Sequence, residues 1–334
     1  MSSAIPRIIG VGYDVPAKVR KNDDPIFDCL RRTAPPGADL FQGYDERRVL
    51  AADEDLMTIM RPAALAAIRD AGLEPSDVDL LLGCGSVSPY ISPNELCRLH
   101  QKIGLHERAW VVPLANDFSN FNAGLLFADA FVRAGRAKYV LIVIAGNWTQ
   151  FVSYKTYQAV SAGDGAGAAI LGLSTDASQW ELVDQNTITQ SEFFDAMYMR
   201  GDCVYTQGNS VCALWSAPYF HITDEGIKAF TIFGENAPPR AALVLLRRHG
   251  LIGRDVALIS HQASKVLMDK WQATIQPNQY VETIRTFANM TVATIPVNLA
   301  WAKQKQLIIP DHMILLGIGP DMHTNAVLLR RVKR

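Results

Sequence analysis

Residues 258–264 read Leu-Ile-Ser-His-Gln-Ala-Ser, and this stretch decides the fold class of the chain. The run Val256–Ser260 is apolar and has the length of a buried strand, and an amphipathic helix pattern follows it within a few residues. Such a change from strand to helix is typical of α/β proteins. His261 stands at the junction, which is where open α/β sheets bind their ligands.

The same alternation of apolar runs and amphipathic stretches extends toward the N-terminus. Apolar runs predict strands at 7–12, 79–84, 109–114, 138–145 and 166–171. Helices are predicted at 56–71, at 120–134 and at 94–103. The first two end before Gly72 and Gly135, as helices commonly do, and Pro93 is predicted to open the third.

The second half of the chain repeats this pattern more loosely. A strand is predicted at 180–184, a long helix at 225–249, and a closing hairpin from 313–317 and 326–331. Residues 190–222 show no clear period, and long irregular stretches of this kind often form lids or binding loops. No linker separates the halves, so we expect two packed units, 1–172 and 173–334.

The composition excludes several classes of function. The 334 residues carry a formal net charge of −1, which provides no overall field for holding nucleic acid or an anionic membrane. No signal-peptide pattern and no apolar run of about 20 residues is present, so a cytoplasmic protein without a membrane span is expected. The odd number of cysteines, without C-x-x-C spacing, argues against disulfides and metal binding: Cys29, Cys84, Cys97, Cys203 and Cys212.

Two further segments carry candidate chemistry. Residues 161–169 read Ser-Ala-Gly-Asp-Gly-Ala-Gly-Ala-Ala, where alternating glycines permit close backbone contact and a buried Asp164 could bind neighbouring amides. Alone, this motif is more typical of a tight turn before a core strand than of a phosphate loop. Asn289 precedes a helix start rich in small residues that includes Pro296, and it follows His261 by 28 positions.

Taken in order, the three segments resemble the β-ketoacyl-acyl carrier protein synthase III family of the thiolase superfamily, whose members carry GDGAGA, HQAN and GNT at these places. Residues 9–16, 43–48, 71–79 and 135–143 resemble other parts of the same family. The resemblance implies an α/β, thiolase-type, five-layer αβαβα fold with two pseudo-equivalent halves. It also implies a homodimer and no permanently bound cofactor, with coenzyme A or acyl carrier protein thioesters as substrates and partners.

In this family a cysteine takes the acyl group, while a histidine and an asparagine stabilise the developing enolate oxygen. His261 and Asn289 match those two positions. An ungapped alignment places Phe118 at the position of the cysteine, and Ser119, one residue out of register, is the nearest alternative nucleophile. Ser119 also suits the cap of a helix, which is its more ordinary role.

The substrate entrance departs from the family as well. Pro320 falls on a glycine that donates a backbone N–H to the thioester oxygen, and proline has no N–H. Residues expected to bind substrate are Arg47, Arg48, Lys265 and Gly319, although the three basic side chains equally suit an ordinary solvated surface.

Three functions follow from these observations. The chain could be a condensing or acyl-transfer enzyme that uses Ser119 or forms no covalent acyl-enzyme. It could instead be a catalytically silent partner of a cysteine-bearing relative in a heterodimer, or a scaffold that binds carrier protein. The third is an inactivated variant of an active synthase, in which phenylalanine replaced cysteine at position 118.

Overall fold

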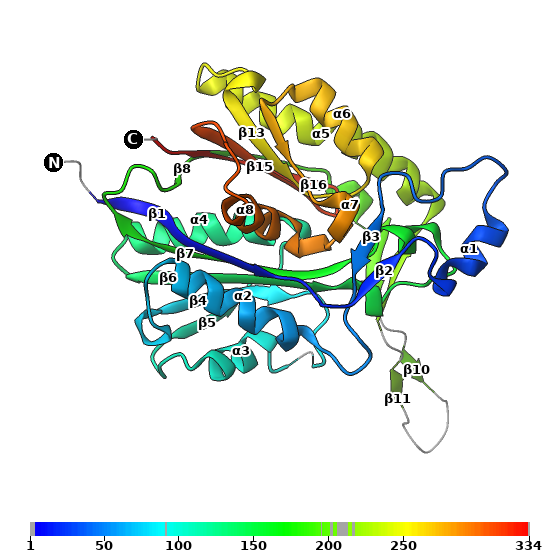
Figure 1. Cartoon of the computed structure of the whole chain (residues 1–334), viewed down its shortest axis with the longest axis horizontal. Helices are drawn as coiled ribbons and strands as arrows, with labels where there is room; N and C mark the ends of the chain where they lie inside the picture. Colours follow the sequence, from blue (N-terminus) through cyan, green and yellow to red (C-terminus); the bar gives the residue numbers. More distant parts are fainter. Residues whose placement is uncertain are drawn as a thin grey trace.

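Two five-stranded sheets face each other across a layer of helices, and further helices cover the outer face of each sheet (Figure 1). The computed structural model describes residues 4–90, 92–194, 196–200, 203–205, 213–215 and 218–332.

The first sheet is built from the N-terminal half and has the order β5-β4-β6-β7-β1. Its central strand β6 runs parallel to β4, which is parallel to β5, and antiparallel to β7, which is antiparallel to β1. The strands are β1 (Ile5–Asp14), β4 (Leu80–Gly85), β5 (Trp110–Pro113), β6 (Tyr139–Asn147) and β7 (Asp164–Ser174).

The second sheet repeats this arrangement with strands from the C-terminal half. Its order is β14-β13-β15-β16-β8, again with two parallel pairs followed by two antiparallel pairs. The strands are β14 (Gln279–Val281), β13 (Val256–Ser260), β15 (His312–Ile318), β16 (His323–Arg330) and β8 (Glu181–Thr189). The halves are therefore equivalent in topology, while the boundary between residues 172 and 173 stays a prediction.

The helices complete a five-layer arrangement. Helices α2 (Leu56–Asp70) and α3 (Glu95–Ile103) pack on the first sheet, and α5 (Asp224–Arg248) and α6 (Lys265–Ile275) pack on the second. Between the sheets lie α4 (Asn120–Arg133) and α8 (Thr294–Gln304). The expected α/β, thiolase-type fold is thus confirmed.

Short elements connect these layers. They are β2 (Val19–Lys21), β3 (Glu46–Arg48), β9 (Met197–Arg200), β10 (Cys203–Tyr205), β11 (Ala213–Trp215), β12 (Tyr219–Ile222), α1 (Asp28–Thr33) and α7 (Ile284–Phe287). The 3-10 helix η3 (Asp117–Ser119) leads directly into α4.

Most predicted elements are present, and three predictions need correction. Pro93 does not open α3, because Asn94 caps the helix through its side chain and helical residues begin at Glu95. The strand predicted at 180–184 extends to Thr189, since its pairing with β16 continues that far. The region 190–222 contains four short strands, although part of it lies outside the described residues.

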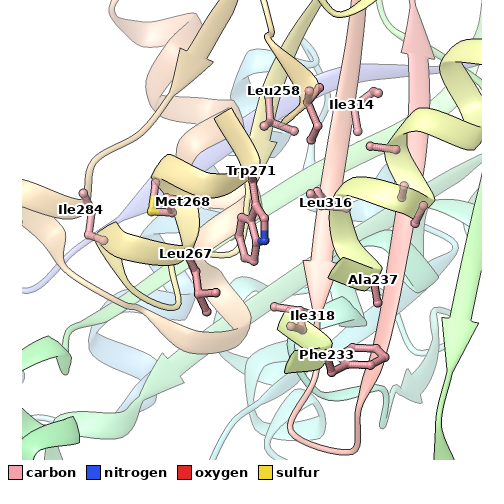
Figure 2. Close-up of a cluster of buried hydrophobic side chains, with 14 of the residues drawn as sticks. Phe233, Ala237, Leu258, Leu267, Met268, Trp271, Ile284, Ile314, Leu316 and Ile318 are labelled. Atoms are coloured by element: carbon pink, nitrogen blue, oxygen red, sulfur yellow. The ribbon is translucent and has the colours of Figure 1, made fainter. Parts of the chain in front are cut away.

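The outer core of the second sheet shows how the helices are fixed. Trp271 of α6 is completely buried, and Figure 2 shows its ring between α6 and the strands, near Leu316. Its indole N–H donates to the carbonyl of Gly234 on α5, with 2.6 Å between the nitrogen and the oxygen. This side chain therefore joins two helices to the sheet by both packing and a hydrogen bond.

Replacing Trp271 with alanine should lower the free energy of unfolding by about 3–5 kcal/mol, because the change leaves a large cavity and an unpaired carbonyl. Urea denaturation followed by circular dichroism measures the loss. Ile232→Ala is the control, because Ile232 lies on α5 with 67% of its surface exposed and should change the value by less than about 0.5 kcal/mol. Equal effects of the two substitutions would contradict the conclusion that Trp271 joins the helices to the sheet.

Candidate active site

His261 directly follows β13, as predicted, and is held by hydrogen bonds at both its backbone and its ring. Its backbone N–H donates to Leu316 O at 2.8 Å, which places it beside Gly317 on the neighbouring strand. Its Nδ1 lies 3.2 Å from the carbonyl oxygen of Thr291. Because a carbonyl can only accept, Nδ1 carries the proton and the neutral ring presents a lone pair at Nε2.

Burial keeps this imidazole neutral. Only 1% of His261 is exposed, and desolvation lowers the pKa of the ring to about 3, although the bond to Thr291 opposes the shift. The ring is therefore a hydrogen-bond acceptor at Nε2 at neutral pH. The family resemblance implies donation from this histidine, whereas the geometry favours proton acceptance.

Asn289 lies beside His261 because its backbone pairs with the glycine motif. Its N–H donates to Ser161 O at 2.8 Å, and its carbonyl accepts from the N–H of Gly163 at 3.0 Å. Its side-chain Oδ1 accepts from the backbone N–H of Thr291 at 2.9 Å, which leaves the Nδ2 hydrogens as donors. His261 and Asn289 therefore bond to the carbonyl and the amide of the same residue, Thr291.

The alternating glycines of 161–169 allow this approach. A Cβ at Gly163 would lie 2.1 Å from the carbonyl oxygen of Phe287, and one at Gly167 would lie 2.6 Å from the carbonyl carbon of Pro296. A side chain at Gly163 would therefore push away the segment that carries Asn289, and one at Gly167 would push away α8, which follows it. The motif is thus a packing surface for the asparagine loop.

Asp164 fixes the other side of the motif, as its sequence context predicted. The side chain is completely buried and accepts hydrogen bonds from the backbone N–H groups of Leu50 and Thr149 and from the Thr149 hydroxyl. It binds neighbouring amides, which is the role expected of a buried acid in such a turn.

Backbone strain is concentrated around the paired side chains. Ala288 and Thr291 adopt φ values of 58° and 50°, and Asp117 in η3 has a φ of 43°. Residues other than glycine avoid this region unless the surrounding structure imposes it, and such residues cluster at functional sites. The strain therefore favours a functional role for this part of the fold.

Phe118 covers the imidazole. Its ring stacks on His261 with a centroid separation of 4.5 Å and an interplanar angle of 13°. An aromatic side chain thus occupies the space next to the histidine, at the start of α4, where the alignment expects a cysteine. That position 118 corresponds to the family's cysteine stays a prediction of the alignment.

Ser119 occupies the N-cap position of α4, but its hydroxyl makes no capping bond. The residue is completely buried, and its Oγ has no hydrogen-bond partner in the described part of the chain. The hydroxyl lies over Gly317, where a Cβ would be 2.5 Å from Oγ. The helix-cap role therefore does not account for this serine.

Arg47 is not placed to meet a ligand from solvent. It is completely buried, and its Nε donates to Val160 O at 2.7 Å. The guanidinium lies over the rings of Phe27, Phe41 and Tyr44, and burial lowers its pKa to about 10. This environment favours a structural role, because a substrate could contact Arg47 only if the surrounding aromatic side chains moved away.

The other two basic candidates also have partners. The Nη1 of Arg48 lies 3.4 Å from Pro16 O. Lys265 forms ion pairs with Asp269 at 2.9 Å and Glu282 at 3.1 Å. Neither residue contacts the His261 and Asn289 pair, so their roles in substrate binding stay predictions.

The turn between β15 and β16 holds side chains that sequence reasoning missed. The Gly319 N–H donates to His323 O at 2.8 Å, so this amide is already in use. His323 Nδ1 lies 2.5 Å from Asp321 Oδ1, and His323 Nε2 is buried without a partner in the described chain. The available signal was a histidine two residues after an aspartate in the predicted closing hairpin.

The cysteines offer no replacement nucleophile in the described residues. Cys84 is buried and near Asn120, and desolvation raises the pKa of its thiol to about 12, which disfavours the reactive thiolate. Cys29 and Cys97 are free, the side chain of Cys203 is not described, and Cys212 lies outside the described residues.

The described ranges hold no group of three or more His, Cys, Asp or Glu side chains arranged for a metal ion. Within the same ranges, no helix combines the length and apolar character required to cross a bilayer.

The architecture and ordered motifs define a thiolase-type protein, and comparisons show which family it resembles. The family model for 3-oxoacyl-[acyl-carrier-protein (ACP)] synthase III matches residues 114–191, and the model for the C-terminal part of that synthase matches 246–331. A β-ketoacyl-[acyl-carrier-protein] synthase III of Geobacillus kaustophilus (strain HTA426) is 27% identical over 330 residues, covering 97% of this chain and 98% of that protein. The chain is therefore similar to the synthase III family in both of its halves and along nearly its whole length.

Solved structures share the fold at lower identity. The 3-oxoacyl-(acyl carrier protein) synthase III of Pseudomonas aeruginosa PAO1 superposes with a TM-score of 0.82 at 23% identity, covering 98% of this chain and 99% of that one. The priming β-ketosynthase from the R1128 polyketide biosynthetic pathway gives a TM-score of 0.82 at 19% identity, covering 99% and 97%.

The depressed pKa of His261 predicts acid sensitivity. The folded ring binds a proton less readily than the unfolded one, so stability should be full above pH 6.5 and fall as the pH drops toward 3. Lowering the pH from 7 to 5 should reduce the free energy of unfolding by about 2 kcal/mol through this group alone.

Urea denaturation of the wild type and His261→Gln at both pH values measures this cost. The substitution should flatten the acid dependence, whereas the control His106→Gln, on the loop before β5, should keep it. A wild-type slope that survives in His261→Gln would rule out this ring as the source.

Proposed function

We propose that this chain is an acyl-thioester condensing or acyl-transfer enzyme of fatty-acid, polyketide or secondary-metabolite biosynthesis that works without a cysteine nucleophile. The proposal is supported by the hydrogen bonds that His261 and Asn289 each make to the backbone of Thr291. The free Nδ2 hydrogens of Asn289 suit a developing enolate or thioester oxygen, and buried donors are most effective at such charge. The lone pair at His261 Nε2 suits a proton from the acyl acceptor.

The substrates we propose are thioesters of coenzyme A or acyl carrier protein. A decarboxylating malonyl thioester would place its enolate oxygen at Asn289, and the carbon nucleophile would attack an acyl thioester directly. No metal or redox group is needed for that reaction, because the carbon–carbon bond that breaks as carbon dioxide leaves supplies the electron pair. A homodimer and a cytoplasmic location stay predictions. We propose that a second copy would pack against exposed Trp110 on the edge strand β5 and exposed Phe127 on α4.

Malonyl-coenzyme A provides the direct test of the enolate site. The wild type should release carbon dioxide and acetyl-coenzyme A above the buffer rate, and Asn289→Ala should lower that rate by roughly 100-fold or more, as for the loss of an oxyanion donor. Labelled carbon dioxide and chromatography of the thioesters measure both products. Asn236→Ala on α5, an exposed asparagine, is the matched control. Full activity in Asn289→Ala would refute the proposed role.

A second function is favoured by the stacking of Phe118 on His261. The ring fills the space next to the histidine, and Pro320 cannot provide a backbone donor. These features suit a silent partner that supports a cysteine-bearing relative in a heterodimer or binds carrier protein. They also suit an inactivated variant of an active synthase.

The Phe118→Cys variant separates the alternatives. A thiol at 118 would lie beside His261 at the N-terminus of α4, where the helix dipole favours a thiolate. We expect incubation with acetyl-coenzyme A to add one acetyl group at residue 118, detected by peptide mass spectrometry. Phe127→Cys, an exposed position on the same helix, should stay unmodified. Absence of an adduct at 118 would mean that this residue is not at the nucleophile position.

A further inference from the structure

The hairpin of β15 and β16 carries an imidazole and a carboxylate that the proposed enolate site does not use. Asp321 holds Nδ1 of His323 at 2.5 Å, so the proton lies at Nδ1 and Nε2 presents its lone pair. Burial alone would raise the pKa of Asp321, but its bonds to His323 and nearby backbone amides outweigh this effect and lower it. The carboxylate of Asp321 is therefore placed to orient the imidazole through Nδ1.

Ser119 and His323 lie over two glycines at the C-terminal end of β15. The Ser119 hydroxyl sits over Gly317, and the His323 ring sits over Gly319, where a Cβ would lie 2.5 Å from Cε1. Gly319 follows the last residue of β15, and its N–H still donates to His323 O, so the pairing of the hairpin continues to it at roughly 7 Å from Gly317. Both glycines are needed, because a methyl group at either one would displace the functional side chain above it.

Both groups lack hydrogen-bond partners although both are buried. Ser119 is 0% exposed and His323 is 4% exposed, and neither Ser119 Oγ nor His323 Nε2 has a partner in the described residues. Native proteins rarely leave such atoms unsatisfied, and a donor hydroxyl and an acceptor nitrogen are complementary. One bridging water between the two atoms would join them.

Space for an acyl group adjoins His323 and Asp321. A cavity of about 330 Å³ borders Asp321 and His323, and Asn116, just before η3, forms part of its wall. Partial burial and repulsion from Asp321 raise the pKa of Asp117, whereas His323 lowers it, which places this acid in the same cluster. The cluster therefore lies against the loop that carries Phe118 and Ser119.

We propose that Ser119, His323 and Asp321 form an acyl-accepting triad, an inference that rests on the proposed acyl-thioester function. The Ser119 oxygen attacks the thioester carbonyl, and its proton passes to His323 Nε2. The tetrahedral intermediate then collapses and the carbon–sulfur bond breaks. The departing thiolate takes the proton from His323, which leaves an ester on Ser119 and a free thiol.

Acetyl-coenzyme A is the probe for this triad. The wild type should gain one acetyl group at Ser119, Ser119→Ala should gain none, and His323→Gln and Asp321→Asn should each acylate roughly 100-fold more slowly. Intact-mass and peptide mass spectrometry over time measure the adduct. His312→Gln, at the opposite end of β15, is the matched control and should acylate at the wild-type rate.

Two further measurements separate catalysis from structural damage. Added imidazole should restore acylation in His323→Ala but not in Ser119→Ala, and circular dichroism checks that each variant is folded. No adduct on wild-type Ser119, or an adduct formed equally fast in folded His323→Gln and Asp321→Asn, overturns the triad. Release of carbon dioxide from malonyl-coenzyme A that depends on Asn289 tests the proposed function separately, so either idea can fail while the other stands.

Discussion

The close crossing of backbone segments at glycines is the constraint on which the site depends. The loop bearing Asn289 reaches its place only because Gly163 has no side chain, and Gly167 allows the same close approach to α8. On the opposite side of the site, Gly317 leaves room for the Ser119 hydroxyl. Where packing is this tight, even one methyl group must move backbone, so these glycines set the positions of the reacting groups.

Burial then determines where the protons lie. His261 is enclosed and bonded to a carbonyl, so it stays neutral with Nδ1 protonated. His323 has the same tautomer for a different reason, since the carboxylate of Asp321 holds its Nδ1 proton. Two imidazoles with free lone pairs therefore flank the start of α4, one directly after β13 and one on β16. A site with two such acceptors is better suited to receive protons than to donate them.

The departures from the family lie together in space. Phe118 and Ser119 belong to η3, and Pro320 and Asp321 belong to the turn that follows β15. The strand β15 contacts η3, so a change in one segment alters the surroundings of the other. A ring over the histidine and a proline in the turn are consistent with a site adapted to chemistry without the cysteine.

The sequence alone determined the α/β class, nearly all long strands and helices, and the identity of His261 and Asn289 as a pair, because apolar periodicity and ordered motifs are local in the chain. It also indicated that Asp164 binds amides. Only the tertiary structure decided that Arg47 is enclosed by aromatic rings, that Phe118 stacks on His261, and that the Ser119 hydroxyl lies over Gly317. The last two relations join residues 143 and 198 positions apart, and side-chain burial and hydrogen-bond satisfaction depend on such long-range contacts rather than on local pattern.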